Sequence, residues 1–246
     1  MKAQLWELLR RSPQLQKRDF ILFLLPFLLW AGGFYSRGSL IYPRCAIDPN
    51  SCTKANIFLV DQLTLGMQNS RADQLSFVTQ NWSGYIAAAT PPIISTALVV
   101  AGKISPVNAL ILMAVDMVIL LESVAWNGTV TEAARLIVQR PRPFVYNDPK
   151  GMGVNPAHYT SFFSGHTSFA AVTGLFLVFT LIGRGASRRW IVGSSIYASC
   201  MIILTGIFRV MAGRHFITDV LAAALAGSAV AFTIAKIHRK NGLRKS

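Results

Sequence analysis

The residues with the clearest chemical potential lie near the C-terminal end of the chain, at positions 208–219. His215 and Asp219 are four residues apart, which places them on one face of a helix, about one turn from each other. A neighbouring aspartate can hold an imidazole in one tautomer and stabilise its positive form, as a nucleophilic or basic histidine requires. Arg209 adds a permanent positive charge six residues before His215. Taken alone, this stretch is equally consistent with a histidine site and with a charged bend between two helices.

Two further stretches carry polar residues that suit a phosphate. Arg135 and Arg142 frame residues 135–143, and Ser164, Gly165 and His166 open an apolar run. The N-terminus of a helix presents free backbone N–H groups to an anion, and arginine matches phosphate oxygens with two parallel hydrogen bonds. No His-x3-His, Cys-x2-Cys or carboxylate cluster has the spacing of a metal site. The sequence therefore predicts a phosphate site that uses arginines and needs no metal or other cofactor.

The composition indicates an integral membrane protein. Hydrophobic residues make up 52% of the chain and charged residues only 14%, whereas about a quarter of the residues of a soluble domain are charged. The mean hydropathy is +0.44. The net charge of +14 does not require a nucleic-acid partner, because lysine and arginine also mark the cytoplasmic side of membrane proteins and bind anionic lipid surfaces. The expected partner is the phospholipid bilayer.

Six apolar runs predict an all-α, polytopic fold with six transmembrane helices. Pro91 and Pro92 predict a kink in the second run, and the third run can continue as a helix to Gln139. Asp116 and Glu122 lie inside the third run, where charges are unfavourable enough to indicate function. The preferred alternative is an inward-facing pair that bonds a neighbouring helix or caps an aqueous cavity. The six runs are 20–36, 83–102, 104–126, 167–183, 190–208 and 216–235.

The remaining segments belong to the same single domain, 1–246, whose motif-bearing part spans 100–235. Residues 1–18 are basic and predict either an amphipathic helix on the membrane surface or a solvated tail. The segment 37–82 connects the first two spans, and its part 55–65 fits an amphipathic helix along the membrane face. Cys45 and Cys52 lie in this segment, where an oxidising compartment favours a disulfide over free thiols. Cys200 is interpreted as a small apolar filler, and His238 as part of a basic tail.

The distribution of charge predicts the orientation in the membrane. Fourteen lysines and arginines fall on the side of the two termini and ten on the other side, where five of the ten cluster around the motifs. By the positive-inside rule, both termini are cytoplasmic and the motifs face the periplasm or its equivalent. A bacterial inner membrane fits this arrangement.

The three stretches, in this order and on one side, resemble the type 2 phosphatidic acid phosphatase (PAP2) family. Its pattern is Lys-x6-Arg-Pro, then Pro-Ser-Gly-His, then Ser-Arg-x5-His-x3-Asp. The first and last elements match with their internal spacing kept, and the middle element matches over its Ser-Gly-His part. Three positions depart from the pattern: Arg135 stands for the lysine, Phe163 for the proline and Phe208 for the serine. The two phenylalanine rings are expected either to alter fine specificity or to face lipid.

The resemblance implies a role for each matched residue. His215 is expected to attack phosphorus and form a phosphohistidine, while Asp219 orients its ring. His166 is expected to protonate the leaving oxygen and then to activate water. The phosphoryl oxygens would be held by Arg135, Arg142, Arg209, Ser164 and Gly165, which stabilise charge in the transition state.

The resulting hypothesis is a metal-independent lipid phosphate phosphatase. Its candidate substrates are phosphatidic acid, phosphatidylglycerol phosphate, undecaprenyl diphosphate and the phosphates of lipid A. Two alternatives compete with it: a vanadate-dependent haloperoxidase, which the apolar spans disfavour, and a non-catalytic lipid head-group binder or transporter. Mere binding does not need a histidine whose tautomer is fixed, so the complete set of His166, His215 and Asp219 disfavours the second alternative.

Overall fold

The computed structural model describes residues 17–243, and this part of the chain is all-α, without a strand. Most of the predicted N-terminal surface helix or tail, 1–18, therefore lies outside the described residues. Six of the helices are long and apolar enough to cross a membrane, which confirms the polytopic all-α prediction. They are α2 (Lys17–Leu40), α5 (Ser70–Val100), α6 (Pro106–Val138), α8 (Gly165–Gly183), α9 (Arg188–Met211) and α10 (Ile217–Leu243).

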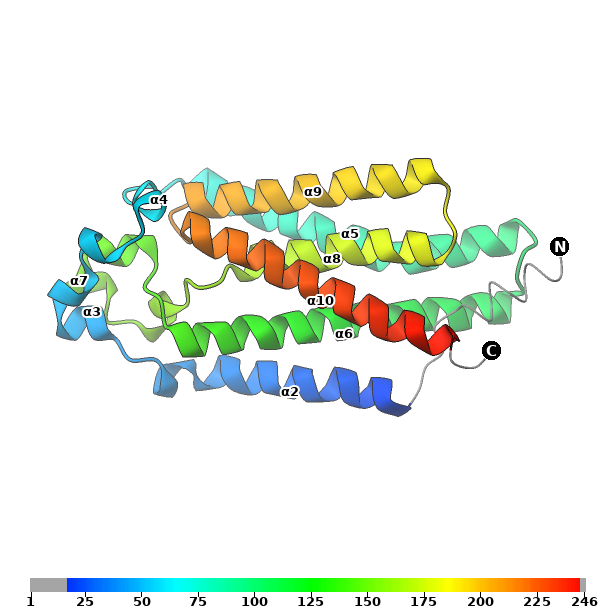
Figure 1. Cartoon of the computed structure of the whole chain (residues 1–246), viewed down its shortest axis with the longest axis horizontal. Coiled ribbons are helices and arrows are strands. Elements are labelled where there is room, and N and C mark those ends of the chain that lie inside the picture. The colour runs from blue at the N-terminus through cyan, green and yellow to red at the C-terminus, as the bar shows by residue number, and fades with distance from the viewer. Residues whose placement is uncertain (1–16, 244–246) are drawn as a thin grey trace.

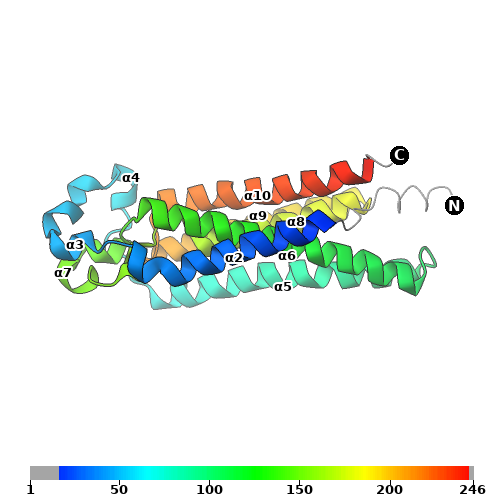
Figure 2. The same cartoon turned by 90° about the horizontal axis from the view of Figure 1, so that it is seen from below.

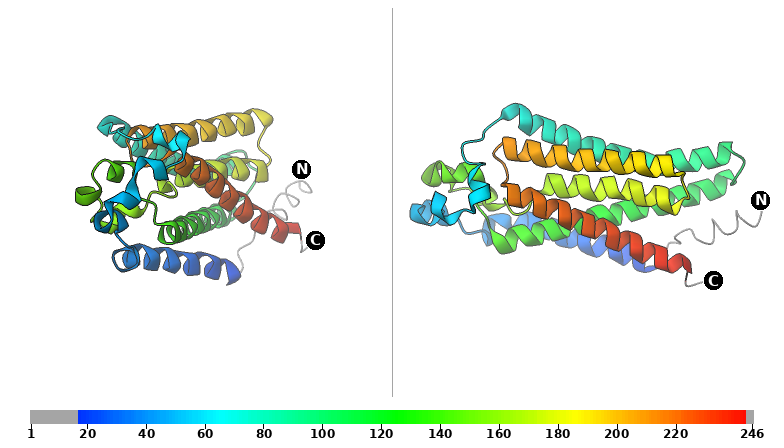
Figure 3. Two further views of the ribbon diagram at one scale, coloured as in Figure 1. Left: turned by 60° about the vertical axis from the view of Figure 1, so that its left-hand side comes forward. Right: turned by 45° about the horizontal axis from the view of Figure 1, so that its top comes forward.

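The six long helices run up and down along one bundle (Figure 1). Helix α8 packs against α5, α6, α9 and α10, and Figure 3 shows it among these neighbours. Helix α2 packs on α6, beside which it lies in Figure 2. We call the end where α2 begins and α10 ends the terminal end, and the opposite end, where α8 and α10 begin, the site end (Figure 1).

Two connecting segments cover the site end, and we call residues 41–69 and 139–164 together the cap (Figure 1). The cap contains only short helical turns. They are α3 (Arg44–Ile47), η1 (Pro49–Cys52), η2 (Lys54–Asn56), α4 (Leu59–Gln62), η3 (Pro143–Tyr146), α7 (Pro149–Met152) and η4 (Pro156–Tyr159). The cap places its backbone beside the N-termini of α8 and α10, which carry two of the three motifs.

Two helices are set by residues beyond the apolar runs. The second span begins 13 residues before the predicted position 83, because the side chain of Asn69 accepts a hydrogen bond from the N–H of Ala72 and caps α5. Pro91 and Pro92 both lie inside this helix. The predicted continuation of the third span is confirmed: α6 runs to Val138, and Gln139 ends it in the left-handed region with φ 45°.

The predicted amphipathic helix at 55–65 is wrong. The chain is extended at Ile57, and only the single turn α4 follows. The side-chain amide of Gln62 donates to the carbonyl oxygen of Ile57 at 3.1 Å and so satisfies backbone that a helix would have paired internally. Asp61 is fully buried and bonds Thr218 at the start of α10, so the segment is fixed by docking on α10.

The two carboxylates predicted inside the third span each bond a neighbouring element, as the preferred interpretation required. Asp116 pairs with Arg184, which directly follows α8. Glu122 bonds the imidazole of His238 on α10 at 2.7 Å. The assignment of His238 to a basic tail is wrong, because α10 continues past 235 and this side chain is buried in the bundle.

Close helix contacts depend on small residues at two positions. A Cβ atom at Gly128 would lie 2.5 Å from the ring of Trp30, so α2 and α6 approach each other over this glycine. A Cβ atom at Gly227 would overlap the backbone carbonyl oxygen of Ser168 and hold α10 away from α8. Small residues at helix contacts are typical of membrane bundles, where association depends on close packing.

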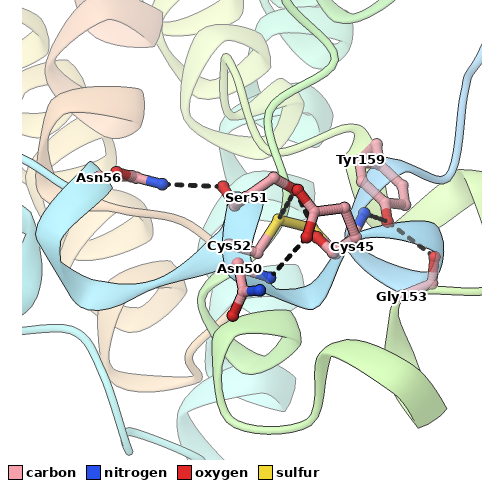
Figure 4. Close-up of a disulfide and its surroundings, with 8 residues drawn as sticks. Cys45, Asn50, Ser51, Cys52, Asn56, Gly153 and Tyr159 are labelled. Atoms are coloured by element: carbon pink, nitrogen blue, oxygen red, sulfur yellow. Dashed lines mark hydrogen bonds between the residues drawn. A yellow bond between two sulfur atoms is a disulfide. The ribbon is translucent and has the colours of Figure 1, made fainter.

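A disulfide joins Cys45 and Cys52, whose Cα atoms are 5.5 Å apart (Figure 4). The backbone N–H of Cys45 donates to the hydroxyl of Tyr159 at 2.9 Å. That hydroxyl in turn donates to the carbonyl oxygen of Gly153 at 2.7 Å. The disulfide is therefore continuous with a hydrogen-bonded link between the two segments of the cap.

Removing the disulfide is expected to destabilise the cap. The double substitution Cys45→Ser and Cys52→Ser should lower the free energy of unfolding by about 2.5 kcal/mol, the loop-entropy value for this short loop. The corresponding fall in melting temperature is roughly 5–10 °C, measured by thermal unfolding in detergent. Cys200→Ser is the matched control, because Cys200 is free and exposed on α9. Equal melting temperatures for the double variant and the control would contradict the expectation.

Candidate active site

Backbone hydrogen bonds tie the three motif-bearing stretches together. The N–H of Arg142 donates to the carbonyl oxygen of His158 at 2.8 Å, and the N–H of Ser161 donates to that of Arg140 at 3.0 Å. The N–H of Ser164 donates to the carbonyl oxygen of Asp219 at 3.3 Å. The first motif is thus fixed to the loop before α8, and α8 is fixed to the start of α10.

The imidazole of His215 is almost completely enclosed, with 1% of its surface exposed. Its Nδ1 lies 2.7 Å from the backbone carbonyl oxygen of Ser161, which can only accept, so Nδ1 carries the proton. The Nε2 atom of the neutral ring then keeps its lone pair. Burial, followed by the positive charges of Arg209, Arg142 and Arg135, holds the pKa of His215 well below its usual value of 6.5. The neutral, nucleophilic form is therefore favoured at pH 7.

Asp219 does not bond the ring of His215 directly. Its Oδ2 lies 3.9 Å from Nδ1, beyond hydrogen-bond distance, and accepts instead from the hydroxyl of Ser161 at 2.6 Å and the N–H of Phe216 at 2.9 Å. Ser161 thus links the two residues, because its hydroxyl binds the carboxylate and its carbonyl oxygen binds the imidazole. In this geometry the aspartate positions the histidine through Ser161.

Arg140 connects this pair to the cap. Its guanidinium donates to Oδ1 of Asp219 at 2.6 Å and to Oδ2 of Asp61 at 2.8 Å. It also donates to the hydroxyl of Thr218 and lies over the ring of Phe216, 4.0 Å from its centroid. Two buried carboxylates hold this arginine, so it supports the site and is not available to a substrate phosphate.

The second motif forms the N-terminus of α8. Ser164 is the N-cap, and its fully buried hydroxyl oxygen accepts from the N–H of Thr167 at 3.4 Å. A Cβ atom at Gly165 would lie 2.6 Å from a guanidinium nitrogen of Arg135. Glycine at this position therefore allows the arginine of the first motif to lie directly against the start of α8.

Arginine is in excess over carboxylate around this helix N-terminus. Glu132 pairs with both Arg37 and Arg135. Asp73 on α5 pairs with Arg209 at 2.7 Å and with Arg214 at 2.8 Å. Arg142 donates to the hydroxyl of Thr160 at 3.1 Å. Two carboxylates are thus shared among four arginines, and a fifth arginine bonds a neutral partner. The excess positive charge favours an anion here.

Four nitrogen atoms of this group are buried without a hydrogen-bond partner among the described residues. They are the Nε atoms of Arg135, Arg142 and Arg209 and the Nε2 atom of His166. Arg135 lies against Gly165 at the start of α8, beside His166, and the charges of Arg135, Arg142 and Arg209 help to lower the pKa of His215. Unpaired buried nitrogens are unfavourable, and a bound oxyanion would supply acceptors for them.

An aromatic side chain, Phe77, lies beside the site. Phe77, a half-exposed residue of α5, and His166 form an edge-to-face ring pair with 4.5 Å between ring centroids, and Arg209 lies 5.9 Å from the Phe77 centroid. Phe163 is buried, with 4% exposure, so the expectation that its ring faces lipid is wrong. Its ring packs near that of Phe162 instead. Phe208 is half-buried.

The structure thus brings together the predicted arginines and histidines and adds supporting residues that sequence reasoning missed. The missed residues are Arg37, Asp61, Asp73, Arg140, Ser161 and Thr218. Arg140 offered a local signal, since it stands two residues before Arg142. Glu132 was accessible as well: it stands three residues before Arg135, which predicts that the two share a helix face, and the structure pairs them. Asp61 and Asp73 gave no signal, because their partners are 79 or more positions away in the chain.

The fold and this site define an integral membrane protein with an arginine-lined histidine site for an anion. The family model of the PAP2 superfamily matches residues 116–243, more than half of the chain, and the chain belongs to this superfamily. Members of the superfamily are generally phosphatases, which supports a phosphoric ester hydrolase at the level of the family. No curated protein and no solved structure matches the chain.

Proposed function

We propose that the protein is a metal-independent phosphatase of a membrane lipid phosphate and works through a phosphohistidine. The observation that carries the proposal is the group of unpaired nitrogens on Arg135, Arg142, Arg209 and His166 beside a neutral His215. A phosphoryl group offers three oxygens to such donors, and its charge matches the excess of arginine. The neutral imidazole supplies a nucleophile without a metal.

The first step is transfer of the phosphoryl group to the enzyme. The Nε2 lone pair of His215 attacks phosphorus, a nitrogen–phosphorus bond forms, and the bond to the lipid oxygen breaks. His166 gives its Nε2 proton to that oxygen, and the alcohol leaves neutral. This step requires protonated His166, and the negative charge of the bound phosphate is needed to offset the positive arginines around that ring. Proton donation of this kind contributes typically about 10²–10⁴-fold to the rate.

The second step returns the enzyme to its starting state. Neutral His166 takes a proton from a water molecule, whose oxygen attacks phosphorus as the bond to His215 breaks. Phosphate leaves, and both imidazoles regain their initial protonation. The guanidinium groups of Arg135, Arg142 and Arg209, with the backbone N–H of Gly165, hold the three phosphoryl oxygens in both steps. Ser164 is the N-cap of α8 and so fixes this N–H. The family resemblance also implies that its hydroxyl donates a hydrogen bond to a phosphoryl oxygen.

A lipid substrate is supported by what surrounds the site. The half-exposed ring of Phe77 contacts His166 and belongs to a helix that can span a membrane, so an apolar surface of α5 lies directly beside the reacting group. The turn α4, which holds Asp61 beside the site, also exposes a group of apolar side chains that suits a membrane surface. They are Phe58, Leu59, Val60 and Leu63.

The proposed orientation places both termini in the cytoplasm and the site at the outer, periplasmic face of an inner membrane. The charge asymmetry of the sequence supports it. The disulfide also supports it, since Cys45 and Cys52 lie at the site end and disulfides persist in oxidising compartments.

A phosphate-release assay tests the function. Detergent-purified protein is given phosphatidic acid, phosphatidylglycerol phosphate, undecaprenyl diphosphate or lipid A in turn, with EDTA present throughout. Release of phosphate from at least one of these lipids is expected, because arginines replace metal ions at the site. Absence of release from all four, or full dependence on an added divalent ion, would refute the proposal. Halide oxidation with added vanadate is measured in parallel and is expected to be absent.

A further inference from the structure

Arg214 carries a charge at the site to which no motif assigns a role. It falls in the x5 part of the third motif, between Arg209 and His215, where the family pattern leaves the residue types open. Its side chain is 42% exposed, whereas that of Arg209 is 4% exposed. Its Nε and Nη2 atoms donate to Oδ2 of Asp73 at 3.1 and 2.8 Å, and its Nη1 atom makes no hydrogen bond among the described residues. A partly exposed guanidinium with a free nitrogen therefore lies at the edge of the phosphate site.

Asp73 places Arg214 directly beside Arg209. Oδ1 of this carboxylate accepts from Arg209 at 2.7 Å, and Oδ2 accepts from Arg214. Two guanidinium groups that share one carboxylate are adjacent, and its single negative charge balances only one of them. The Nε atom of Arg209 is buried and unpaired among the described residues, and the proposed function assigns this arginine to the reacting phosphoryl group. Arg214 is therefore the neighbour of a residue that holds that group.

Helix α5 shows which side of the reacting group Arg214 serves. Asp73 and Phe77 are four residues apart on α5, so they lie on one face, one turn from each other. Phe77 is 47% exposed and contacts His166, which protonates the leaving oxygen in the proposed mechanism. The leaving group begins at that oxygen. Its partly exposed neighbours are therefore Phe77 and Arg214, one apolar and one charged.

The backbone around Arg214 is fixed by contacts with the segment that precedes α5. The N–H of Asn69, the N-cap of α5, donates to the carbonyl oxygen of Met211 at 3.1 Å. Gly213 has φ +66°, and a Cβ atom there would overlap the carbonyl oxygen of Met67, so the two segments are in close contact. An arginine held in place before binding loses less conformational freedom when an anion arrives, which favours affinity.

We infer that Arg214 binds a second phosphoryl group, attached to the reacting one, and that the substrate is a lipid diphosphate. The inference rests on the proposed function, which places the reacting phosphoryl group. His215 attacks the terminal phosphorus, a nitrogen–phosphorus bond forms, and the bond from this phosphorus to the bridging oxygen breaks. His166 gives its proton to the bridging oxygen, and the lipid monophosphate leaves. Arg214 donates to oxygens of the inner phosphoryl group, whose charge and geometry suit a guanidinium.

This arrangement selects among the candidate lipids. Undecaprenyl diphosphate carries its second phosphoryl group directly on the reacting one. Phosphatidylglycerol phosphate carries it across a glycerol, the phosphates of lipid A are attached to separate sugars, and phosphatidic acid has only one phosphate. Because one carboxylate holds Arg209 and Arg214 side by side, the lipid with two adjoining phosphoryl groups fits the pair best.

Kinetics with two lipids that share one chain test the inference. We would measure kcat/KM for phosphate release from undecaprenyl diphosphate and from undecaprenyl phosphate, with EDTA present. Wild-type protein should prefer the diphosphate by at least about tenfold. Arg214→Gln should lower kcat/KM by about 10–100-fold for the diphosphate, the effect of one charge-assisted hydrogen bond, and by less than about threefold for the monophosphate. Arg214→Lys should lie between, because it keeps the charge and loses the fork.

Arg71→Gln is the matched control for that series. It removes an exposed arginine from the first turn of α5, the turn that also carries Asp73, and should keep the wild-type ratio of the two kcat/KM values. A ratio that falls equally in Arg71→Gln and Arg214→Gln would show a general effect of surface charge and overturn the inference.

A binding measurement needs no turnover. Titration calorimetry in EDTA compares inorganic diphosphate with inorganic phosphate, and wild-type protein should bind the diphosphate at least about tenfold more tightly, whereas Arg214→Gln should not. Equal affinities in wild-type protein, or a wild-type kcat/KM ratio in Arg214→Gln, would overturn the inference and leave a phosphatase in place. Preference for diphosphate that depends on Arg214, in a protein that releases phosphate from no lipid, would instead refute the phosphatase and retain the second anion site.

Discussion

Replacing His215 with alanine or asparagine is expected to lower kcat by at least about 10⁴-fold, as removal of a nucleophile does in other covalent mechanisms. The residue contributes the attacking atom, and no other described side chain can replace it, because the remaining histidine of the site is needed as acid and base. Asparagine retains an amide that can still reach the carbonyl oxygen of Ser161, so this variant separates chemistry from packing. Activity is measured as phosphate release from the best lipid substrate.

A control and a trapping experiment accompany this prediction. His158→Ala removes a cap imidazole that bonds the backbone of Met152 and lies against Phe144, outside the phosphate site, and should retain activity. Wild-type protein quenched in alkali during turnover of a labelled substrate should carry phosphate on a histidine, and His215→Asn should not. Full activity of His215→Asn would contradict a role for His215 in catalysis. An unlabelled wild-type protein that turns over would instead favour direct attack by water.

The parts of this site that sequence reasoning captured are those encoded by local spacing. Residues at a helix N-terminus must lie together wherever the chain goes, so Ser164–His166 could be assigned in advance. His215 and Asp219 are near neighbours in the chain and lie close together, but His215 precedes α10, which begins at Ile217, so the pair is not held by one helix face. The six spans were equally accessible, because each is a continuous apolar run. The residues at which the spans begin were not accessible in this way, since the N-cap of α5 is one polar residue, Asn69, outside the apolar run.

What escaped prediction depends on tertiary contacts. Asp61 looked like part of an amphipathic surface helix, yet it lies in the single turn α4 of the cap, which is fixed by docking on Thr218 and Arg140. His238 looked like part of a basic tail, yet the length of α10 returns it to Glu122. The spacing of His215 and Asp219 also predicted the wrong direct partner. The carbonyl oxygen of Ser161, 54 positions away, accepts from the ring, and no local pattern encodes that bond.

This indirect link leads to the second large effect, that of Asp219→Asn, which should lower kcat by about 10²–10⁴-fold. Three donors converge on the carboxylate: the hydroxyl of Ser161 and the N–H of Phe216 on Oδ2, and Arg140 on Oδ1. An amide of the same shape must turn its NH₂ group toward one of these sides. An NH₂ group on the Oδ2 side would place two donors, itself and the N–H of Phe216, against each other. On the Oδ1 side it would meet the guanidinium of Arg140 in the same way. Either choice shifts Ser161, and the imidazole with it.

Asp61→Asn is the matched control. Asp61 is the other buried carboxylate that Arg140 contacts, and Ser161 bonds Asp219 and not Asp61. The two variants should have similarly reduced melting temperatures, since each leaves Arg140 with one carboxylate. Only Asp219→Asn should show the large fall in kcat, and its KM should change little because the phosphate-holding arginines are intact. Ser161→Ala, which keeps the carbonyl oxygen and loses the hydroxyl, should fall between them. A loss confined to KM, or equal kcat values for Asp219→Asn and Asp61→Asn, would show that Asp219 only stabilises the fold and does not position the nucleophile.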